Sequence, residues 1–206
     1  MEIPMHSTVT LTGKSFNTIT DWFNMCREVC GSIIQARGQM TGDDDNPIQI
    51  DEARFAGRRK YNRGRMLIGD ERPLSEDSDA EVANNRNHGR RIDGLWVFGL
   101  KKGHDCRYFY VHRRDAHTLI TIIQRECEVG SVILNHQQNY VDPASGANTQ
   151  SIERSWLDAK IKILRKMRGV PNQLLQSHLD HYCWRLWRKN GDLFDEFLND
   201  IRTVYR

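Results

Sequence analysis

Helical periodicity is the clearest pattern in this chain. Apolar residues recur every three or four positions through residues 15–36, which predicts one long amphipathic helix. Thr20 and Asp21 are candidate N-caps for its start. The apolar stripe consists of Ile19, Trp22, Phe23, Cys26, Val29, Cys30 and Ile33.

Similar sequence patterns predict four further helices. One is expected to begin after Asp115, a residue type that caps helix N-termini. Its predicted core positions are Leu119, Ile120, Ile122, Ile123 and Cys127. The last three helices are predicted over residues 149–168, 172–189 and 191–205.

Short apolar runs between the helices predict strands at residues 48–50, 95–100, 107–111 and 132–134. The first strand delivers Asp51 and Glu52 at its end, and a turn at 101–105 joins the second and third into a hairpin. Strands in this order, followed by helices, indicate an α/β fold. Residues 66–89 and 135–148 lack periodicity and are expected to be loops.

Composition narrows the class of protein. The chain has 206 residues, of which 38% are hydrophobic and 28% charged, as in soluble globular domains. Its apolar runs fall short of the ~20 residues that cross a bilayer, and its first residues do not resemble a signal peptide. We therefore expect an intracellular protein with no membrane partner.

The cysteine content also favours an intracellular protein. Five cysteines, an odd number without a CxxC pair, favour reduced thiols over disulfides or a zinc site. Cys26 and Cys30 would lie one turn apart on a helix, where burial in the core is favoured over metal ligation.

Charge is unevenly distributed although the net charge is only +3. Residues 58–65 contain five cations, Arg58, Arg59, Lys60, Arg63 and Arg65. Residues 66–89 then carry six acids against two arginines. A basic cluster suits nucleic-acid phosphates, but such runs are also common on solvated surfaces.

Candidate chemistry appears on the helix predicted at 149–168. Its buried stripe is Ile152, Trp156, Ala159, Ile163 and Met167. Glu153 and Lys160 are seven residues apart and share one side of the helix, about 10 Å along its axis. Glu153 and Lys160 could simply be solvated charges. Asp51 favours a functional site instead, because a carboxylate at the end of an apolar strand is costly to bury unless it meets a cation or a donor.

An aspartate on a strand and a glutamate on a later helix are typical of two-metal phosphoryl-transfer sites. Several segments carry a more specific pattern: IDEARFAGRRKYNRGR, RRIDGLWVFGL, VHRRDAHTLITIIQREC, GSVIL, NHQQNYVDPASGANTQSIERSWLDAKIK and YCWR. In order and spacing they closely resemble the ISXO-two-like transposase domain, a DDE-type family of insertion-sequence origin. The resemblance spans most of residues 15–205.

The resemblance implies a ribonuclease-H-like α/β fold with a mixed sheet, flanking helices and helical C-terminal packing. It implies that Asp51 is the first catalytic acid, Glu153 the third, and Lys160 the lysine that follows. Asp51 and Glu153 would bind Mg²⁺ or Mn²⁺. The expected partner is DNA, bound by Lys160 together with the cations of 58–65, in a homo-oligomer on DNA ends. The location would be nuclear in a eukaryote and cytoplasmic in a bacterium.

Two departures from the family pattern bear on activity. Residues 66–89 form an acidic insert, and the strand that normally ends in Asp-Glu-Trp after GSxI is absent, because Leu134 runs directly into Asn135. His136 stands where the second acid would be if no gap is allowed, while Asp142 belongs to a different motif.

The N-terminal region also differs. The segment SxxTIxDWxxxxREVC resembles the second helix of a helix-turn-helix, but only a polar leader is expected before it. Residues 1–40 are therefore interpreted as a helical remnant of that region, and 41–206 as the transposase-like domain. We expect a transposase-derived DNA-binding protein that is catalytically defective. Two alternatives stay open: an active Mg²⁺-dependent transposase, and a non-functional product of a decayed element or faulty gene model.

Overall fold

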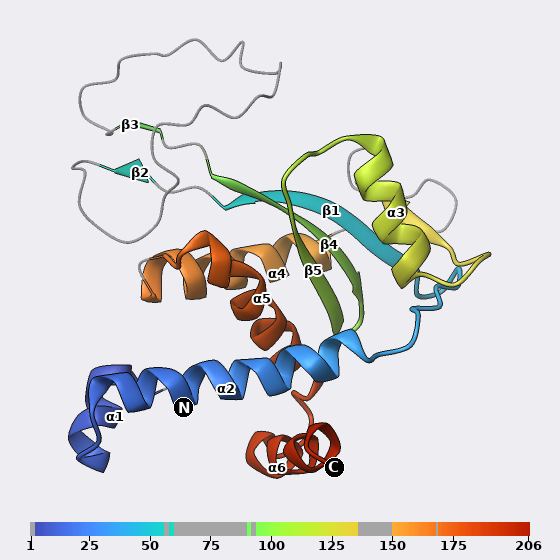
Figure 1. Ribbon diagram of the computed structural model, residues 1–206. Coiled ribbons are helices and arrows are strands. Elements are labelled where there is room, and N and C mark those ends of the chain that lie inside the picture. Colours follow the sequence, from blue (N-terminus) through green and yellow to red (C-terminus); the bar gives the residue numbers. More distant parts are fainter. Residues whose placement is uncertain (1–2, 56–57, 60–89, 92–93, 136–149, 168) are drawn as a thin grey trace.

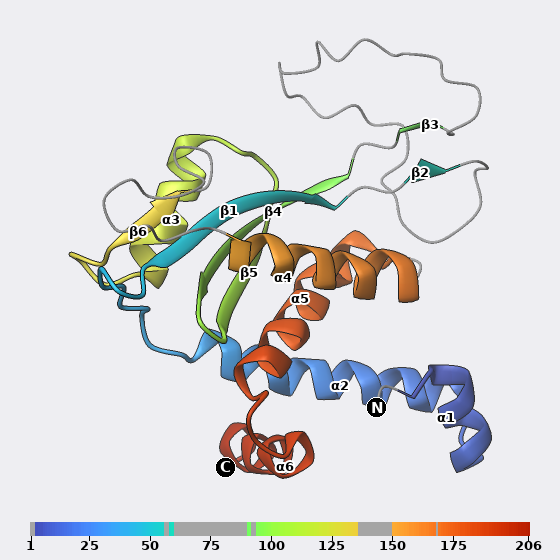
Figure 2. The same cartoon turned by 180° about the vertical axis from the view of Figure 1, so that it is seen from behind.

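The computed structural model describes residues 3–55, 58–59, 90–91, 94–135, 150–167 and 169–206. Its centre is a four-stranded sheet in the order β5-β4-β1-β6. Helices α4 and α5 cover one face of this sheet, and α3 covers the other (Figures 1 and 2). The chain is thus a mixed α/β protein.

The sheet combines antiparallel and parallel pairing. β1 (Ile48–Phe55) pairs antiparallel with β4 (Leu95–Lys102), which pairs antiparallel with β5 (Asp105–Val111). The chain then passes through α3 (Ala116–Glu126) to β6 (Ile133–Asn135), which is parallel to β1. Two short strands, β2 (Arg58–Arg59) and β3 (Arg90–Arg91), form a separate antiparallel pair.

The predicted hairpin is confirmed as β4 and β5, with Gly103 in the left-handed region at φ 58°. The predicted end of the first strand was wrong. β1 continues to Phe55, so Asp51 lies within the strand and not at its end. Charged residues do not stop β1, because Glu52 and Arg54 are only half-buried while Ala53 and Phe55 on the α4 face are buried.

The long N-terminal helix is confirmed as α2 (Phe16–Gln35), with a different cap. Ser15 is extended and its hydroxyl accepts the Thr18 N–H at 3.1 Å, so Ser15 is the N-cap and Thr20 and Asp21 lie inside the helix. The expected polar leader was also wrong. A further helix, α1 (Met5–Thr12), precedes α2 and ends at Gly13 in the left-handed conformation.

The described residues from Gln150 onward form helices, as predicted. α4 (Gln150–Lys160) passes directly into a π-helix, η1 (Ile161–Lys166). α5 (Asn172–Trp187) and α6 (Leu193–Val204) follow. α6 is attached to α5 through Asp200, a buried carboxylate that accepts Trp184 Nε1 at 2.7 Å and Arg188 at 2.8 Å. No helix among the residues described is long and apolar enough to cross a membrane.

The sheet separates two clusters of buried side chains. One, beneath α4 and α5, includes Phe55, Tyr108, Ile152, Trp156, Ile163 and Leu179. The other, beneath α3, includes Ile48, Ile50, Phe98, Leu100 and Ile122. Among the core positions predicted for α3 and for the helix at 149–168, Ile120 and Met167 were wrong, because Ile120 is 51% exposed and Met167 36%. Ile120 lies on the side of α3 that faces away from the sheet.

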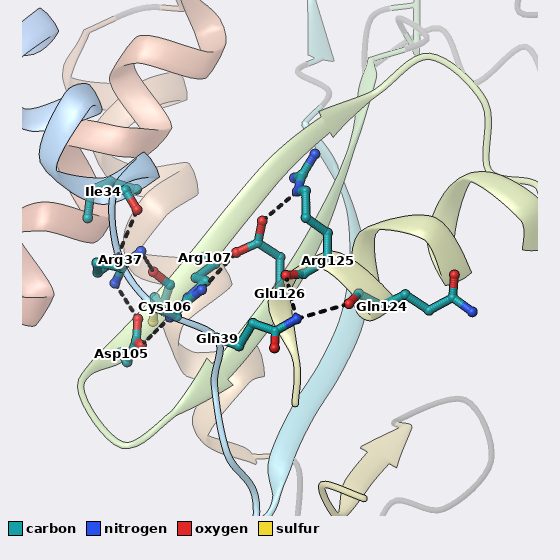
Figure 3. Close-up of polar contacts among 10 residues, drawn as sticks. Ile34, Arg37, Gln39, Asp105, Cys106, Arg107, Gln124, Arg125 and Glu126 are labelled. Atoms are coloured by element: carbon teal, nitrogen blue, oxygen red, sulfur yellow. Dashed lines mark hydrogen bonds and ion pairs between the residues drawn. The ribbon is translucent and has the colours of Figure 1, made fainter. Parts of the chain in front are cut away.

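A network of ion pairs joins the segment after α2 to the sheet and to α3. Arg37 and Arg107 both pair with Asp105, and Arg107 also binds Glu126 at 2.8 Å (Figure 3). Arg107 donates in addition to the carbonyl of Gly38 at 2.7 Å. The two arginine side chains are only 5% exposed, so these contacts hold the N-terminal helices against the body of the protein.

Candidate functional site

Asp51 is the centre of the candidate site. It lies in the middle of β1, faces α4 and is only 8% exposed. Trp156 Nε1 donates a hydrogen bond to Asp51 Oδ2 at 3.1 Å, and the backbone N–H of Glu52 donates to Oδ1 at 2.8 Å. A buried carboxylate without such donors would be strongly unfavourable. These contacts therefore explain how an acid is tolerated in mid-strand.

Alternate residues of β1 meet successive turns of α4. Gln49 Oε1 accepts the backbone N–H of Ile152 at 3.0 Å, near the start of the helix, where N–H groups lack partners within the helix. Two residues further along β1, Asp51 meets Trp156. The strand thus fixes both where α4 begins and how it is rotated.

Lys160 lies one turn beyond Trp156. Its ammonium nitrogen is 5.8 Å from the centre of the Phe55 ring, within range of a cation–π contact. Burial lowers the pKa of Lys160, and the negative charge of Asp51 opposes this shift. Asp51 and Lys160 are therefore close enough to interact electrostatically.

Glu153 is half-buried on α4, three residues before Trp156. Its helix packs directly on β1, the strand that carries Asp51. The structure thus brings together Asp51, Trp156 and Lys160, and places Glu153 on the same helix one turn earlier.

The strand β6, next to β1 in the sheet, is relevant to the second catalytic acid that the sequence resemblance implies. β6 runs parallel to β1, and its last pair joins Asn135 to Ile50, the residue before Asp51. The three residues of β6 are Ile133, Leu134 and Asn135, none of which is acidic. The strand beside Asp51 therefore contributes no carboxylate.

His136, Lys60, Arg63, Arg65 and the acidic insert at 66–89 lie outside the described residues. Arg58 and Arg59 are described through their backbone pairing in β2.

A Mg²⁺ site would need several oxygen donors around Asp51. Within the described ranges, no group of three or more His, Cys, Asp or Glu side chains could hold a metal ion. Asp51 Oδ2 already accepts an indole N–H, and both Lys160 and the carboxylate of Glu52 lie close enough to Asp51 to interact electrostatically. The described residues by themselves therefore do not supply the several oxygen ligands that each of two divalent cations requires.

Trp156 was expected only as part of the buried stripe, and its contact with Asp51 was missed. A signal was available, since a buried indole N–H usually needs an acceptor and a buried carboxylate needs a donor. The indole is also stacked on Tyr108, with ring centres 4.1 Å apart and planes inclined by 20°.

The cysteines do not form a site in this structure. All five are free thiols; Cys30, Cys106, Cys127 and Cys183 are buried, and Cys26 is exposed. Core burial was thus correct for Cys30 and wrong for Cys26.

A second polar region lies between the end of α2 and the last two helices. A cavity of about 520 Å³ is lined there by Arg37, Arg107 and Arg188 together with Asp105 and Asp200. These charges pair with one another, Arg188 with Asp200 and the other two with Asp105. We therefore interpret the region as structural.

No family model, curated protein or solved structure is detectably similar to this chain.

Proposed function

We propose that this protein is a transposase-derived DNA-binding protein with a ribonuclease-H-like fold that has lost DNA cutting. The observation that carries this proposal is the strand β6. It pairs parallel to β1 up to the residue next to Asp51, yet it supplies no acid. Asp51, the proposed first acid, lies on β1, and the adjacent strand β6 contributes no acid.

The arrangement around Asp51 supports the same reading. An aspartate on the first strand, with Glu153 and Lys160 on a later helix packed across it, matches the order that the sequence resemblance implies. The mixed sheet, with three antiparallel strands and a parallel strand reached through a helix, is compatible with that fold. His136, which follows Asn135 in the sequence, remains the proposed replacement for the second acid.

The remaining residues suit DNA binding better than cutting. Trp156 fixes one carboxylate oxygen of Asp51, and the negative charge of Asp51 favours the protonated form of Lys160. A lysine held in this way can pair with a phosphate as a point charge. Loss of metal ligands removes the charge stabilisation that drives strand cleavage.

The test uses the full-length chain in two assays. Supercoiled plasmid incubated with Mg²⁺ or Mn²⁺ should show no nicking or joining above background. A labelled 30-base-pair duplex should bind, with an affinity that falls as salt rises. Lys160→Ser should flatten this salt dependence by about one unit of slope, whereas Lys166→Ser, an exposed lysine on η1, is the matched control.

Two results would overturn the proposal. Metal-dependent cutting that disappears in Asp51→Ala and in Glu153→Ala would show an active transposase. A folded protein without measurable duplex binding would remove the DNA-binding function.

A further inference from the structure

The outer edge of β5 is closed by side chains and not by another strand. Among the described residues, β5 is the last strand of the sheet on the side of β4. An open edge of this kind presents unpaired backbone groups to other chains and is a common site of strand pairing between proteins. Figures 1 and 2 both show α5 beside β5, and the two elements are in contact. Helix side chains can therefore reach this edge.

Gln176, on α5, makes the central contacts with the edge. Its Oε1 accepts the backbone N–H of Tyr110 at 2.8 Å, and its Nε2 donates to the backbone carbonyl of Tyr108 at 2.8 Å. The amide thus engages one C=O and one N–H two residues apart, as the backbone of one residue in a neighbouring strand would do. Gln176 therefore takes the place of one residue of a further strand.

Two other side chains extend this closure along β5. Arg37 donates to the carbonyl of Cys106 at 3.2 Å (Figure 3). The thiol of Cys183 receives a hydrogen bond from the backbone of Tyr108. Together with Gln176, these side chains satisfy backbone groups on alternate residues of β5, which are the residues that turn these groups away from β4.

Asp180 fixes the orientation of the Gln176 amide. It lies one turn further along α5, and its Oδ1 accepts Gln176 Nε2 at 2.8 Å. An ionised carboxylate can only accept, so it selects the orientation in which Nε2 also donates to Tyr108. Asp180 is only 6% exposed, which keeps water from competing for this bond.

A second copy of β5 is complementary to the same backbone groups. In an antiparallel pair of β5 strands related by a twofold axis at Phe109, the carbonyl of Tyr108 in each copy faces the N–H of Tyr110 in the other. These are the two groups that Gln176 occupies. The second strand can therefore pair only where α5 has moved away from the edge.

We propose that α5 is a releasable cover over a strand-pairing edge, that Gln176 is its latch, and that β5 pairs with β5 of a second copy when the latch is lost. The inference is independent of the proposed DNA binding. Without the amide, a backbone N–H and a backbone C=O beneath α5 lack partners, which is costly. Pairing with a second copy restores both hydrogen bonds.

The experiment compares self-association of the full chain and its variants by sedimentation velocity over a range of protein concentrations. Gln176→Leu removes the amide at nearly constant volume. It should associate at a protein concentration at least about tenfold lower than the wild type. Gln173→Leu adds the same apolar side chain at an exposed position one turn earlier on α5, and it should behave like the wild type.

Hydrogen exchange at the Tyr110 amide identifies the surface that pairs. This amide should be protected in the wild type, exchange faster in dilute Gln176→Leu, and be protected again in the associated form. Three outcomes would overturn the proposal. They are a folded Gln176→Leu that associates no more readily than the wild type, equal association of Gln173→Leu, and a Tyr110 amide that stays unprotected after association.

A second variant decides the matter if circular dichroism shows that Gln176→Leu does not fold. Gln176→Glu keeps an acceptor for the Tyr110 N–H but cannot donate to the Tyr108 carbonyl, and its charge repels Asp180. It should also associate more readily than the wild type. A folded Gln176→Glu with the association behaviour of the wild type would contradict the role of Gln176 as a latch.

Discussion

A Cβ atom at Gly99 would lie 2.5 Å from Cζ2 of Trp156, closer than real side chains approach. Gly99 is also the direct cross-strand partner of Asp51. Only a residue without a side chain lets the indole lie flat over the sheet and reach the carboxylate. The glycine in the LWVFGL strand is therefore required by the contact between β1 and α4.

Gly99→Ala should lower the free energy of unfolding by about 1–3 kcal/mol, the usual cost of overpacking a well-filled core. The indole cannot retreat, because Tyr108 stacks against it and Asp51 holds its N–H. Denaturant unfolding measures the change. Gly38→Ala is the matched control, since nothing lies within 4 Å of a Cβ there. Equal stabilities for the two variants would contradict the assigned packing.

The bond between Trp156 and Asp51 can be measured with a double-mutant cycle. Trp156→Phe removes the N–H and leaves a buried carboxylate short of a donor, which should cost about 1–3 kcal/mol. Asp51→Asn removes the charge but keeps an acceptor for the indole. The two changes should be non-additive by at least about 0.5 kcal/mol, as determined by chemical unfolding. Strict additivity would mean that the negative charge of Asp51 does not strengthen its bond with Trp156.

Two buried groups on α5 should give stability opposite dependences on pH. Burial raises the pKa of Asp180 from 3.8 to about 6, although Gln176 and Arg37 oppose the shift. Burial lowers the pKa of His178 from 6.5 to about 4, and the positive charges of Arg27 and Lys162 add to this effect.

The sign of each pH dependence of stability follows from whether the folded or the unfolded state binds more protons. At Asp180 the folded state binds more protons between pH 3.8 and about 6, so this group stabilises the fold as the pH falls through that window. At His178 the unfolded chain binds more protons between about pH 4 and 6.5. As the pH falls through this range, His178 therefore makes the fold less stable. The two contributions oppose each other in the wild type.

Single substitutions should separate these contributions. Relative to the wild type, Asp180→Asn should become less stable as the pH falls from 7 to 4.5, and His178→Gln should become more stable. Guanidinium unfolding at both pH values gives the two differences. His117→Gln, an exposed histidine on α3, controls for a change in histidine number. A change of the same sign in both buried variants would refute the assignment.

Local patterns in the sequence predicted the elements well. Asp115 immediately precedes an apolar period, and its carboxylate caps α3 by accepting the Thr118 N–H at 2.9 Å. The period of α2 was also clear, but Ser15 was missed as its cap because the apolar stripe begins four residues later, at Ile19. Propensity could not give the length of β1, since its charged residues are accommodated by half-burial and not by a strand end.

Contacts between distant segments were harder to predict. The bond between Trp156 and Asp51 joins residues 105 positions apart, and periodicity alone marks Trp156 only as buried. The pairing of Arg90 and Arg91 with the earlier arginines depends on strand register, which no local pattern specifies. In contrast, Ile152, Ala159 and Ile163 were correctly predicted as core because each lies on one side of a single helix.

The π-helix η1 makes tolerance to length changes unequal on the two sides of Lys160. A π-helical turn closes over one more residue than an α-helical turn, so losing one residue from η1 can be absorbed by a return to α-helix. Such a deletion leaves every contact between α4 and β1 in place. A single residue inserted between Trp156 and Lys160 would rotate the lysine by about 100° away from Asp51. A one-residue deletion should therefore be tolerated within η1, whereas a one-residue insertion between Trp156 and Lys160 should not.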